Sequence, residues 1–188
     1  MKIGVLALQG DFAEHITMLQ HLGVETAEVR LAQHLVDLHG LIIPGGESTT
    51  MGKLCIDYCL VEPLRSFGKE HAIWGTCAGA ILISKSTQRD QPLLELMDIT
   101  VERNAFGRQI DSFEANLEVT DLGNKKAYHA IFIRAPIIKS VQKDARVLAT
   151  LPDGRIVAAC QRNMLATSFH PELTADTRFH RFFLSLVN

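Results

Sequence analysis

The sequence predicts an α/β protein with a doubly wound, mostly parallel sheet and an antiparallel extension. In the first half, short apolar runs alternate with segments of helical spacing, which is the pattern of strands and helices around a parallel sheet. The second half holds mainly short strand candidates and one clear hairpin turn at Pro152–Arg155, which is typical of antiparallel pairing. Without repeats or a linker, residues 1–188 are expected to form one domain.

In the first half, each strand is expected where a continuous apolar run would be covered on both faces of the sheet. The first such run is Ile3–Leu8, and the helical spacing of Phe12, Ile16, Leu19 and Leu22 follows it up to Gly23. Further strands are predicted at residues 24–29, 41–43 and 72–76. Helices are predicted between them, one reaching Leu60 and one opening at Glu62.

In the second half, several short strands are expected to pair antiparallel and to extend the sheet. The candidates are residues 99–102, 115–119, 130–134, 147–151, 156–159 and 165–169. A closing helix is predicted over residues 174–187, with phenylalanines near one face.

Composition excludes several classes of function. Hydrophobic residues make up 47% and charged residues 21% of the chain, and the net charge is −2. These values are ordinary for a globular protein and give no sign of a nucleic-acid or anionic-membrane partner. No apolar run reaches the roughly 18–20 residues of a membrane span. The apolar N-terminus is short and lacks a plausible signal cleavage site, so we expect a cytoplasmic protein.

The four cysteines do not suggest a disulfide framework in a chain of this size. Cys55 and Cys59 are four residues apart on a predicted helix, and no second pair of ligands accompanies them. We therefore expect both to pack in the core rather than to bind metal, and no metal site is predicted.

Cys77 stands where a buried strand is expected to turn sharply into a helix, in the segment Gly75–Gly79. Small neighbours allow a tight turn that lifts the central side chain out of the sheet. A helix N-terminus beside a sulfur favours the thiolate, the nucleophilic form of cysteine. From this segment alone, a buried structural cysteine remains an equal alternative.

His170 is the histidine best placed to act as a base for Cys77. It is expected at the end of an apolar strand, where α/β proteins collect functional groups. In an extended segment, residues two apart point to the same side, so Glu172 can reach the imidazole ring. Cys77, His170 and Glu172 therefore form a candidate catalytic triad, and a surface His-Pro-Glu turn is the alternative. His15 is expected to be solvated or at an interface, and the remaining histidines to be structural.

Acyl transfer also needs donors for the oxyanion. The backbone N–H of Ala78 is one candidate, and the loop after the third strand can bring that of Gly46 beside it. A phosphate loop is the rival interpretation of the Gly-rich segment, but the Walker pattern is absent. A plain turn into a helix remains open. Arg103 lies in the polar loop Glu102–Gln109, where an arginine can grip a substrate carboxylate or an acidic partner surface, and ordinary surface charge is the alternative. Arg134 stands at another strand end.

Eight segments, in order along nearly the whole chain, carry a resemblance to a known family. They are Leu8–Gly10, Pro44–Thr49, Gly75–Gly79, Glu102–Asn104, Phe106–Gln109, Asp111–Glu114, Phe132–Pro136 and Ser168–Thr174. The cysteine turn with His-Pro-Glu resembles the class I, triad-type glutamine amidotransferases, whose architecture is a flavodoxin-like three-layer α/β fold. The other segments resemble, more narrowly, the glutaminase subunits of pyridoxal 5′-phosphate synthase.

This resemblance implies hydrolysis of L-glutamine to L-glutamate and ammonia through a γ-glutamyl thioester on Cys77. It implies that the substrate site is formed by Gly46, Glu47, Ser48, Arg103, Ile133 and Arg134. It also implies a separate (β/α)8-barrel synthase subunit, in a large hetero-oligomer with a dodecameric core, that receives the ammonia for vitamin B6 biosynthesis. Pyridoxal phosphate would then be the product of the complex, and no cofactor is expected in this chain.

Two other functions remain open. The chain could be an amidotransferase subunit of another pathway, such as histidine or nucleotide synthesis, against which the segment from Arg103 to Glu114 argues. It could also be a non-catalytic scaffold or thiol sensor on the same fold, which would need Cys77 but neither His170 nor Glu172.

Overall fold

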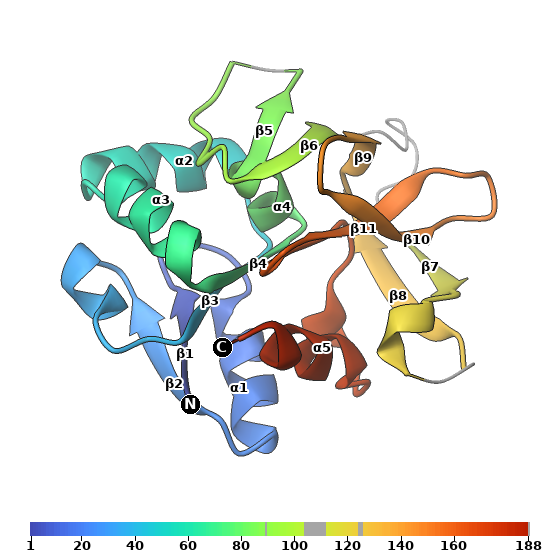
Figure 1. Cartoon of the computed structure of the whole chain (residues 1–188), viewed down its shortest axis with the longest axis horizontal. Coiled ribbons are helices and arrows are strands. Elements are labelled where there is room, and N and C mark those ends of the chain that lie inside the picture. The colour runs from blue at the N-terminus through green and yellow to red at the C-terminus, as the bar shows by residue number, and fades with distance from the viewer. Residues whose placement is uncertain (89, 104–111, 124–125, 188) are drawn as a thin grey trace.

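The computed structural model describes residues 1–88, 90–103, 112–123 and 126–187, and these form a ten-stranded sheet with helices on both faces (Figure 1). Five neighbouring strands run parallel, in the order β2, β1, β3, β4, β12. Their bounds are Glu25–Val29, Lys2–Leu6, Gly40–Ile43, Ala72–Thr76 and Met164–Thr167. This order places β4, which leads to Cys77, beside β12, which leads to His170.

Beyond β12 the sheet continues through antiparallel pairs, in the order β11, β9, β6, with β5 added parallel at the edge and β10 paired with β11. The bounds are Ile156–Gln161 (β11), Ile137–Val141 (β9), Met97–Glu102 (β6), Ser84–Thr87 (β5) and Arg146–Thr150 (β10). Two strands, β5 and β9, were absent from the sequence-based prediction.

Helices cover the parallel part from both sides (Figure 1). One core contains residues of α2, α3 and α4, and the other contains residues of α1 and α5. The bounds are Phe12–His21 (α1), Ser48–Asp57 (α2), Val61–Glu70 (α3), Ala78–Ile83 (α4) and Arg178–Leu186 (α5). The described residues also contain short 3₁₀ segments at Ala32–Leu35, Thr120–Leu122 and Pro171–Leu173.

Strands β7 (Ser112–Leu117) and β8 (Tyr128–Ile133) form a separate two-stranded sheet. The sequence predicted that several of the second-half strands extend the main sheet without saying which, and the structure shows that β7 and β8 pair antiparallel outside it. The hairpin packs on the α5 side through aromatic rings: Phe132 meets Phe169 with centroids 5.6 Å apart, and Tyr128 meets Phe179 at 4.7 Å. Such ring pairs stabilise an interface beyond the apolar area they bury.

The predicted α/β class with a mostly parallel sheet and an antiparallel extension is confirmed. Two local predictions are wrong. Cys55 is buried as expected, but α2 ends at Asp57 and Cys59 lies beyond it, exposed, with a φ of 54°. The closing helix begins at Arg178 and not at Thr174, because Thr174 is extended (φ −118°, ψ 160°) after the 3₁₀ turn Pro171–Leu173.

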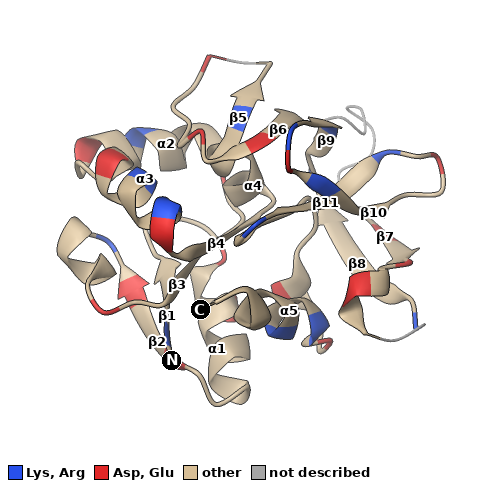
Figure 2. Cartoon of the chain, in the orientation of Figure 1, with Lys and Arg blue, Asp and Glu red and all other residues tan. Residues whose placement is uncertain are grey.

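Basic and acidic residues are spread over helices, strands and loops in both halves of the chain (Figure 2). Within the ranges described above, no helix is both long and apolar enough to cross a membrane.

Candidate active site

Cys77 occupies a sharp turn between the end of β4 and the start of α4. Its backbone angles are φ 47° and ψ −103°, outside the regions that L residues ordinarily adopt. Its N–H donates to the carbonyl oxygen of Thr167 on β12 at 2.8 Å, which ties the turn to the next strand. Strain of this kind is kept only where the surroundings enforce it, and it is common at nucleophiles placed on strand-to-helix turns.

Gly79 makes this turn possible by close approach. A Cβ atom built on Gly79 would lie 2.0 Å from the carbonyl oxygen of Ile43 on β3. Real Cβ atoms do not come so close to backbone, so any side chain here would push α4 away from the sheet. The position of the Cys77 sulfur therefore depends on residue 79 being a glycine, without a Cβ atom.

His170 follows β12 and is held by both backbone and side chain. Its N–H donates to the carbonyl oxygen of Ile131 on β8 at 2.9 Å. Its Nδ1 lies 2.7 Å from Oε1 of Glu172, whose side chain is fully buried. The two residues meet because Pro171–Leu173 forms a 3₁₀ turn, so the pairing expected from an extended segment arises through a different local structure.

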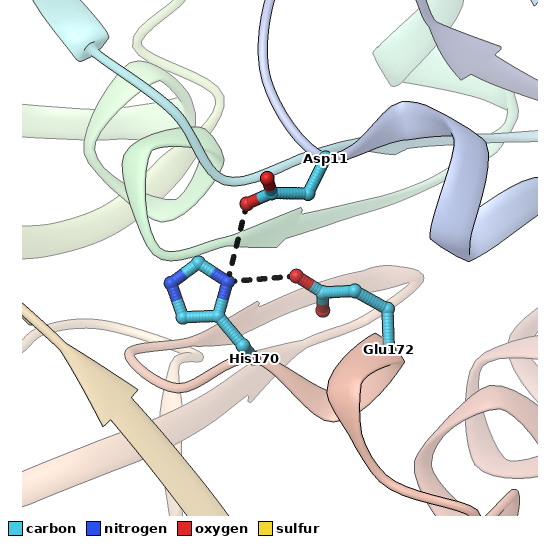
Figure 3. Close-up of side chains that lie close together, drawn as sticks. All are labelled: Asp11, His170 and Glu172. Atoms are coloured by element: carbon cyan, nitrogen blue, oxygen red, sulfur yellow. Dashed lines mark hydrogen bonds and ion pairs between the residues drawn. The ribbon is translucent and has the colours of Figure 1, made fainter. Parts of the chain in front are cut away.

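Asp11 is a second carboxylate at the same imidazole nitrogen. Its Oδ2 lies 3.4 Å from His170 Nδ1, and Nε2 of the ring points away from both carboxylates (Figure 3). Gly45 permits this contact, because a Cβ there would lie 2.5 Å from Cε1 of His170. Sequence reasoning missed Asp11, although its place just after the first strand, at the carboxyl edge of the sheet, was a usable signal.

The surroundings of His170 favour its charged form. Burial opposes the charge, but contacts with Asp11, Cys77 and Glu172 outweigh it and raise the pKa of His170 well above 6.5. In return, the hydrogen bond with His170 lowers the pKa of Asp11. Burial raises the pKa of Glu172, and its contact with His170 opposes that rise. A protonated imidazole beside a cysteine stabilises the thiolate, so the arrangement suits a nucleophilic sulfur.

A cavity of about 460 Å³ opens between these elements. All the residues predicted for catalysis, oxyanion stabilisation or substrate binding line it, except Glu172, which lies behind His170. The lining residues are Gln9, Gly10, Asp11, Gly46, Glu47, Ser48, Cys77, Ala78, Ile81, Arg103, Ile133, Arg134, Pro136 and His170. A volume of this order suits a small metabolite, and the polar lining suits a zwitterion better than a hydrocarbon.

On one wall, Arg103, which directly follows β6, connects the loop after β3 with the segment between β5 and β6. Its Nη2 lies 2.7 Å from Oε1 of Glu47, and its Nη1 donates to Oε1 of Gln91 at 3.2 Å. The hydroxyl of Ser48 donates to the same oxygen of Gln91 at 3.2 Å. This network fixes Arg103 in the cavity wall, and Gln91 is a member that sequence reasoning missed.

Glu47 also caps α2, because its Oε2 accepts from the N–H of Thr50 at 2.7 Å and from the hydroxyl of Thr49. Burial opposes the charge of Glu47, but the hydrogen bonds from Thr49, Thr50 and Arg103 hold its pKa well below the usual range. Glu47 is therefore ionised at neutral pH and holds both α2 and Arg103 in place.

The opposite wall comes from the end of β8. Ile133 contributes its carbonyl oxygen, which lies 4.0 Å from Sγ of Cys77. Arg134 is exposed and has a φ of 42°, a second strained backbone position in the same cavity. The structure thus brings Ile133 and Arg134 to the side of the cavity that faces Cys77.

The two predicted oxyanion donors border the cavity from different elements. Ala78 is the first residue of α4, so its N–H has no acceptor within the helix. Gly46 lies in the loop after β3, and the neighbouring N–H of Glu47 donates to Oε1 of Gln9 at 2.8 Å, which anchors that loop. The predicted segments Asn104 and Phe106–Asp111 lie outside the described residues.

Asp11, His170 and Glu172 each offer one ligand atom, and these atoms all lie within 4.8 Å of one another. The hydrogen bonds at Nδ1 already account for this proximity. A metal ion would need the lone pair of Nδ1, whereas the contact with Glu172 needs a proton on it. The cluster is explained by hydrogen bonding, and the predicted lack of a metal stays a prediction.

A comparison with known protein families identifies the family to which the chain belongs. The model of the SNO glutamine amidotransferase family matches residues 5–188. The chain belongs to this family.

Relatives support this membership across the whole length. A protein of Herpetosiphon aurantiacus, named "Pyridoxal 5'-phosphate synthase subunit PdxT", is 58% identical and covers 99% of this chain and 100% of its own. A protein of Dehalococcoides mccartyi with the same name is 55% identical over 100% of this chain and 97% of its own. A solved structure titled as a glutamine amidotransferase superposes with a TM-score of 0.92 at 48% identity, over 98% and 97% of the two chains.

In this SNO family member, Asp11→Asn is expected to lower the pKa of His170. The aspartate charge stabilises the imidazolium, so its loss makes the proton easier to remove. Titration of the His170 ring by NMR in wild type and variant measures the change. Asp57→Asn, at the exposed end of α2, is the control and should leave the His170 titration unchanged. Equal pKa values in wild type and Asp11→Asn would contradict the expectation.

Proposed function

We propose that this chain is the glutaminase subunit of a pyridoxal 5′-phosphate synthase, and that it hydrolyses L-glutamine to L-glutamate and ammonia. One observation carries the proposal: Cys77, on its strained turn, shares one cavity with His170, whose Nδ1 is held by Glu172. Family membership and the names of the relatives support the same activity.

In the proposed reaction, Sγ of Cys77 attacks the side-chain amide carbon of glutamine. The thiol proton has passed to His170, and Glu172 keeps the ring oriented through Nδ1. The N–H groups of Gly46 and Ala78 stabilise the negative oxygen of the tetrahedral intermediate. His170 then protonates the leaving nitrogen, and ammonia departs from a γ-glutamyl thioester. Water activated by His170 attacks the thioester carbon, which releases glutamate and restores the thiol.

For the substrate, we propose contacts with both walls of the cavity. Glu47, Ser48 and Arg103 form one wall, in which the fixed guanidinium and carboxylate suit the charged groups of an amino acid. The backbone of Ile133 and Arg134 forms the other wall, beside the sulfur.

We also propose that residues 1–188 act as one domain, in the cytoplasm, in complex with a (β/α)8-barrel synthase subunit. The continuous main sheet, which joins both halves of the chain, supports the single domain. The partner follows from the name that the relatives carry, and a hetero-oligomer with a dodecameric synthase core is part of the proposal.

The test is glutamate release from glutamine by the purified chain, with and without its synthase subunit. We expect hydrolysis that rises strongly when the synthase subunit is added. No release of glutamate in either condition would refute the proposed activity. Stimulation by the synthase of another pathway instead would move the chain to that pathway, and glutamine-independent thiol chemistry alone would favour a sensor.

A further inference from the structure

Two buried histidines lie behind Glu172, and the proposed reaction uses neither. His15 is on α1 and His180 on α5, and both are 0% exposed. The expectation that His15 is solvated or at an interface is therefore wrong. The residue faces the sheet, since its ring reaches Thr76 at the end of β4, and α1 also packs against the segment that carries Glu172.

His15 connects Glu172 with the strand that leads to Cys77. Its Nε2 hydrogen-bonds Oγ1 of Thr76, the last residue of β4, at 3.2 Å, and it also lies 3.2 Å from Oε2 of Glu172. That carboxylate oxygen is buried and has no hydrogen bond within the described part of the chain, so Nε2 of His15 is a polar group at its side. Its Nδ1 lies 3.1 Å from Nε2 of His180. Trp74 contacts both imidazole rings edge to face and helps to bury them.

The two histidines are neutral, so each carries one ring proton. Burial lowers the pKa of His15 well below 6.5 and that of His180 to about 4. In the described part of the chain, Glu172 is the one ionisable side chain that forms an ion-pair contact with His15.

With Glu172 ionised, one placement of the protons suits all of these contacts. If Nε2 of His15 carries the proton, it donates to Oγ1 of Thr76 and turns the positive end of the N–H bond toward Oε2 of Glu172, and Nδ1 accepts from Nε2–H of His180. The opposite tautomer of His15 would set a lone pair against the carboxylate at 3.2 Å, which is repulsive.

The contacts of His180, the last residue in this hydrogen-bonded series, agree with donation from His180 to His15. Nδ1 of His180 is buried and finds no partner among the residues that the structure describes. An acceptor left alone is tolerated better than a donor, so the proton of His180 belongs on Nε2, facing His15.

We propose that His15 is a positioning residue, whose Nε2–H lies beside the otherwise unbonded Oε2 of Glu172 and so keeps that carboxylate ionised and aimed at His170, while His180 fixes the tautomer of His15. Because Glu172 orients His170 in the reaction above, the inference rests on the proposed function. The catalytic carboxylate is then held from both sides: Oε1 faces His170 and Oε2 faces His15.

The test compares His15→Leu, which removes the donor, with His15→Gln, whose amide nitrogen can replace Nε2–H. Both variants are assayed for glutamate release in complex with the synthase subunit. For His15→Leu we expect kcat to fall about tenfold to hundredfold, the effect of removing the polar group beside a buried carboxylate oxygen, with KM within about twofold. His15→Gln should recover most of kcat.

The pH profile separates positioning from simple loss of packing. Without the His15 donor, the charged form of Glu172 is less stable, so its pKa rises and the acid limb of kcat moves to higher pH. His15→Gln should restore the wild-type limb. The titratable groups that face Glu172 in this comparison are His170, His15, Asp11 and Tyr128, and Glu14 and His21 of α1 line a cavity together with it.

Alkylation of Cys77 by iodoacetamide in the isolated chain gives a readout that does not need glutamine turnover. His15→Leu should slow it across neutral pH relative to wild type. His39→Gln, at an exposed position just before β3 and outside the cavities that Cys77 and Glu172 line, should not change it. Thermal unfolding checks that each variant is folded.

An unchanged kcat and pH profile in folded His15→Leu would overturn the inference, and so would equal losses in His15→Leu and His15→Gln. If the wild-type complex itself releases no glutamate, the proposed function fails instead, and the alkylation rates still decide whether His15 acts on the site.

Discussion

Cys77→Ala is expected to abolish glutamine hydrolysis by the synthase-bound chain, with a loss of about four orders of magnitude or more, because members of a triad act as a unit. Without the sulfur no thioester can form, and the other cavity residues cannot supply a nucleophile. Glutamine binding should persist, since the Arg103 wall is untouched. Glutamate release measures the first effect and calorimetric titration with glutamine the second.

Cys59→Ser is the matched control, because Cys59 is exposed and lies outside the cavity. It should hydrolyse glutamine at the wild-type rate. A Cys77→Ala protein that keeps its activity in the complex would refute a thioester mechanism altogether.

Gly79→Ala is expected to destabilise the fold by about 3 kcal/mol and to displace the turn that carries Cys77, since overpacking against immobile atoms costs about 1–3 kcal/mol or more. The added methyl would meet the carbonyl oxygen and carbon of Ile43 at 2.0 and 2.8 Å. The gain in helix propensity, about 1 kcal/mol, is smaller than this repulsion. Urea-induced unfolding measures the stability, and glutamate release in the complex measures the loss of geometry.

Gly68→Ala on α3 is the matched control for this change. Its methyl would meet only side-chain ends, those of Leu96 at 2.8 Å and Ile73 at 3.0 Å, which can rotate aside. Its stability should stay within about 1 kcal/mol of wild type, because propensity and crowding offset each other. Equal destabilisation by the two substitutions would show that the contact with Ile43 has no special weight.

The parallel part of the fold could be predicted from the sequence because buried strands are continuous apolar runs. Leu41–Ile43 and Ala72–Trp74 are examples, and each is fully or almost fully buried. The strands β5 and β9 could not be found in this way. The sequence of β5 is polar, and β9 begins at Ile137, four residues after β8 ends, with no strong turn signal between them.

The pairing of β7 with β8 apart from the main sheet depends on tertiary contacts. Alternating apolar residues predict strands but do not say which sheet they join. One such contact joins the ring of Phe132 on β8 to that of Phe169, which follows β12, and it packs the small sheet beside the main one.

At the site, the residue types and their order along the strands predicted which side chains would meet, but not how. The pair His170 and Glu172 was predicted from an extended segment, yet a 3₁₀ turn brings the two together. His15 was misjudged because its neighbour Glu14 suggested a solvated face. Its spacing of three residues from Phe12 and four from Leu19 already placed it on the apolar stripe of α1.

The small β7–β8 sheet has a mechanical consequence for the cavity. Cys77 is fixed to the main sheet through Thr167, whereas the carbonyl of Ile133 and the backbone partner of His170, Ile131, both belong to β8. One wall of the cavity therefore belongs to the main sheet, and the other belongs to the separate two-stranded sheet. A tilt of the β7–β8 sheet relative to the main sheet changes the distance from the Cys77 sulfur to the Ile133 carbonyl without moving the sulfur itself.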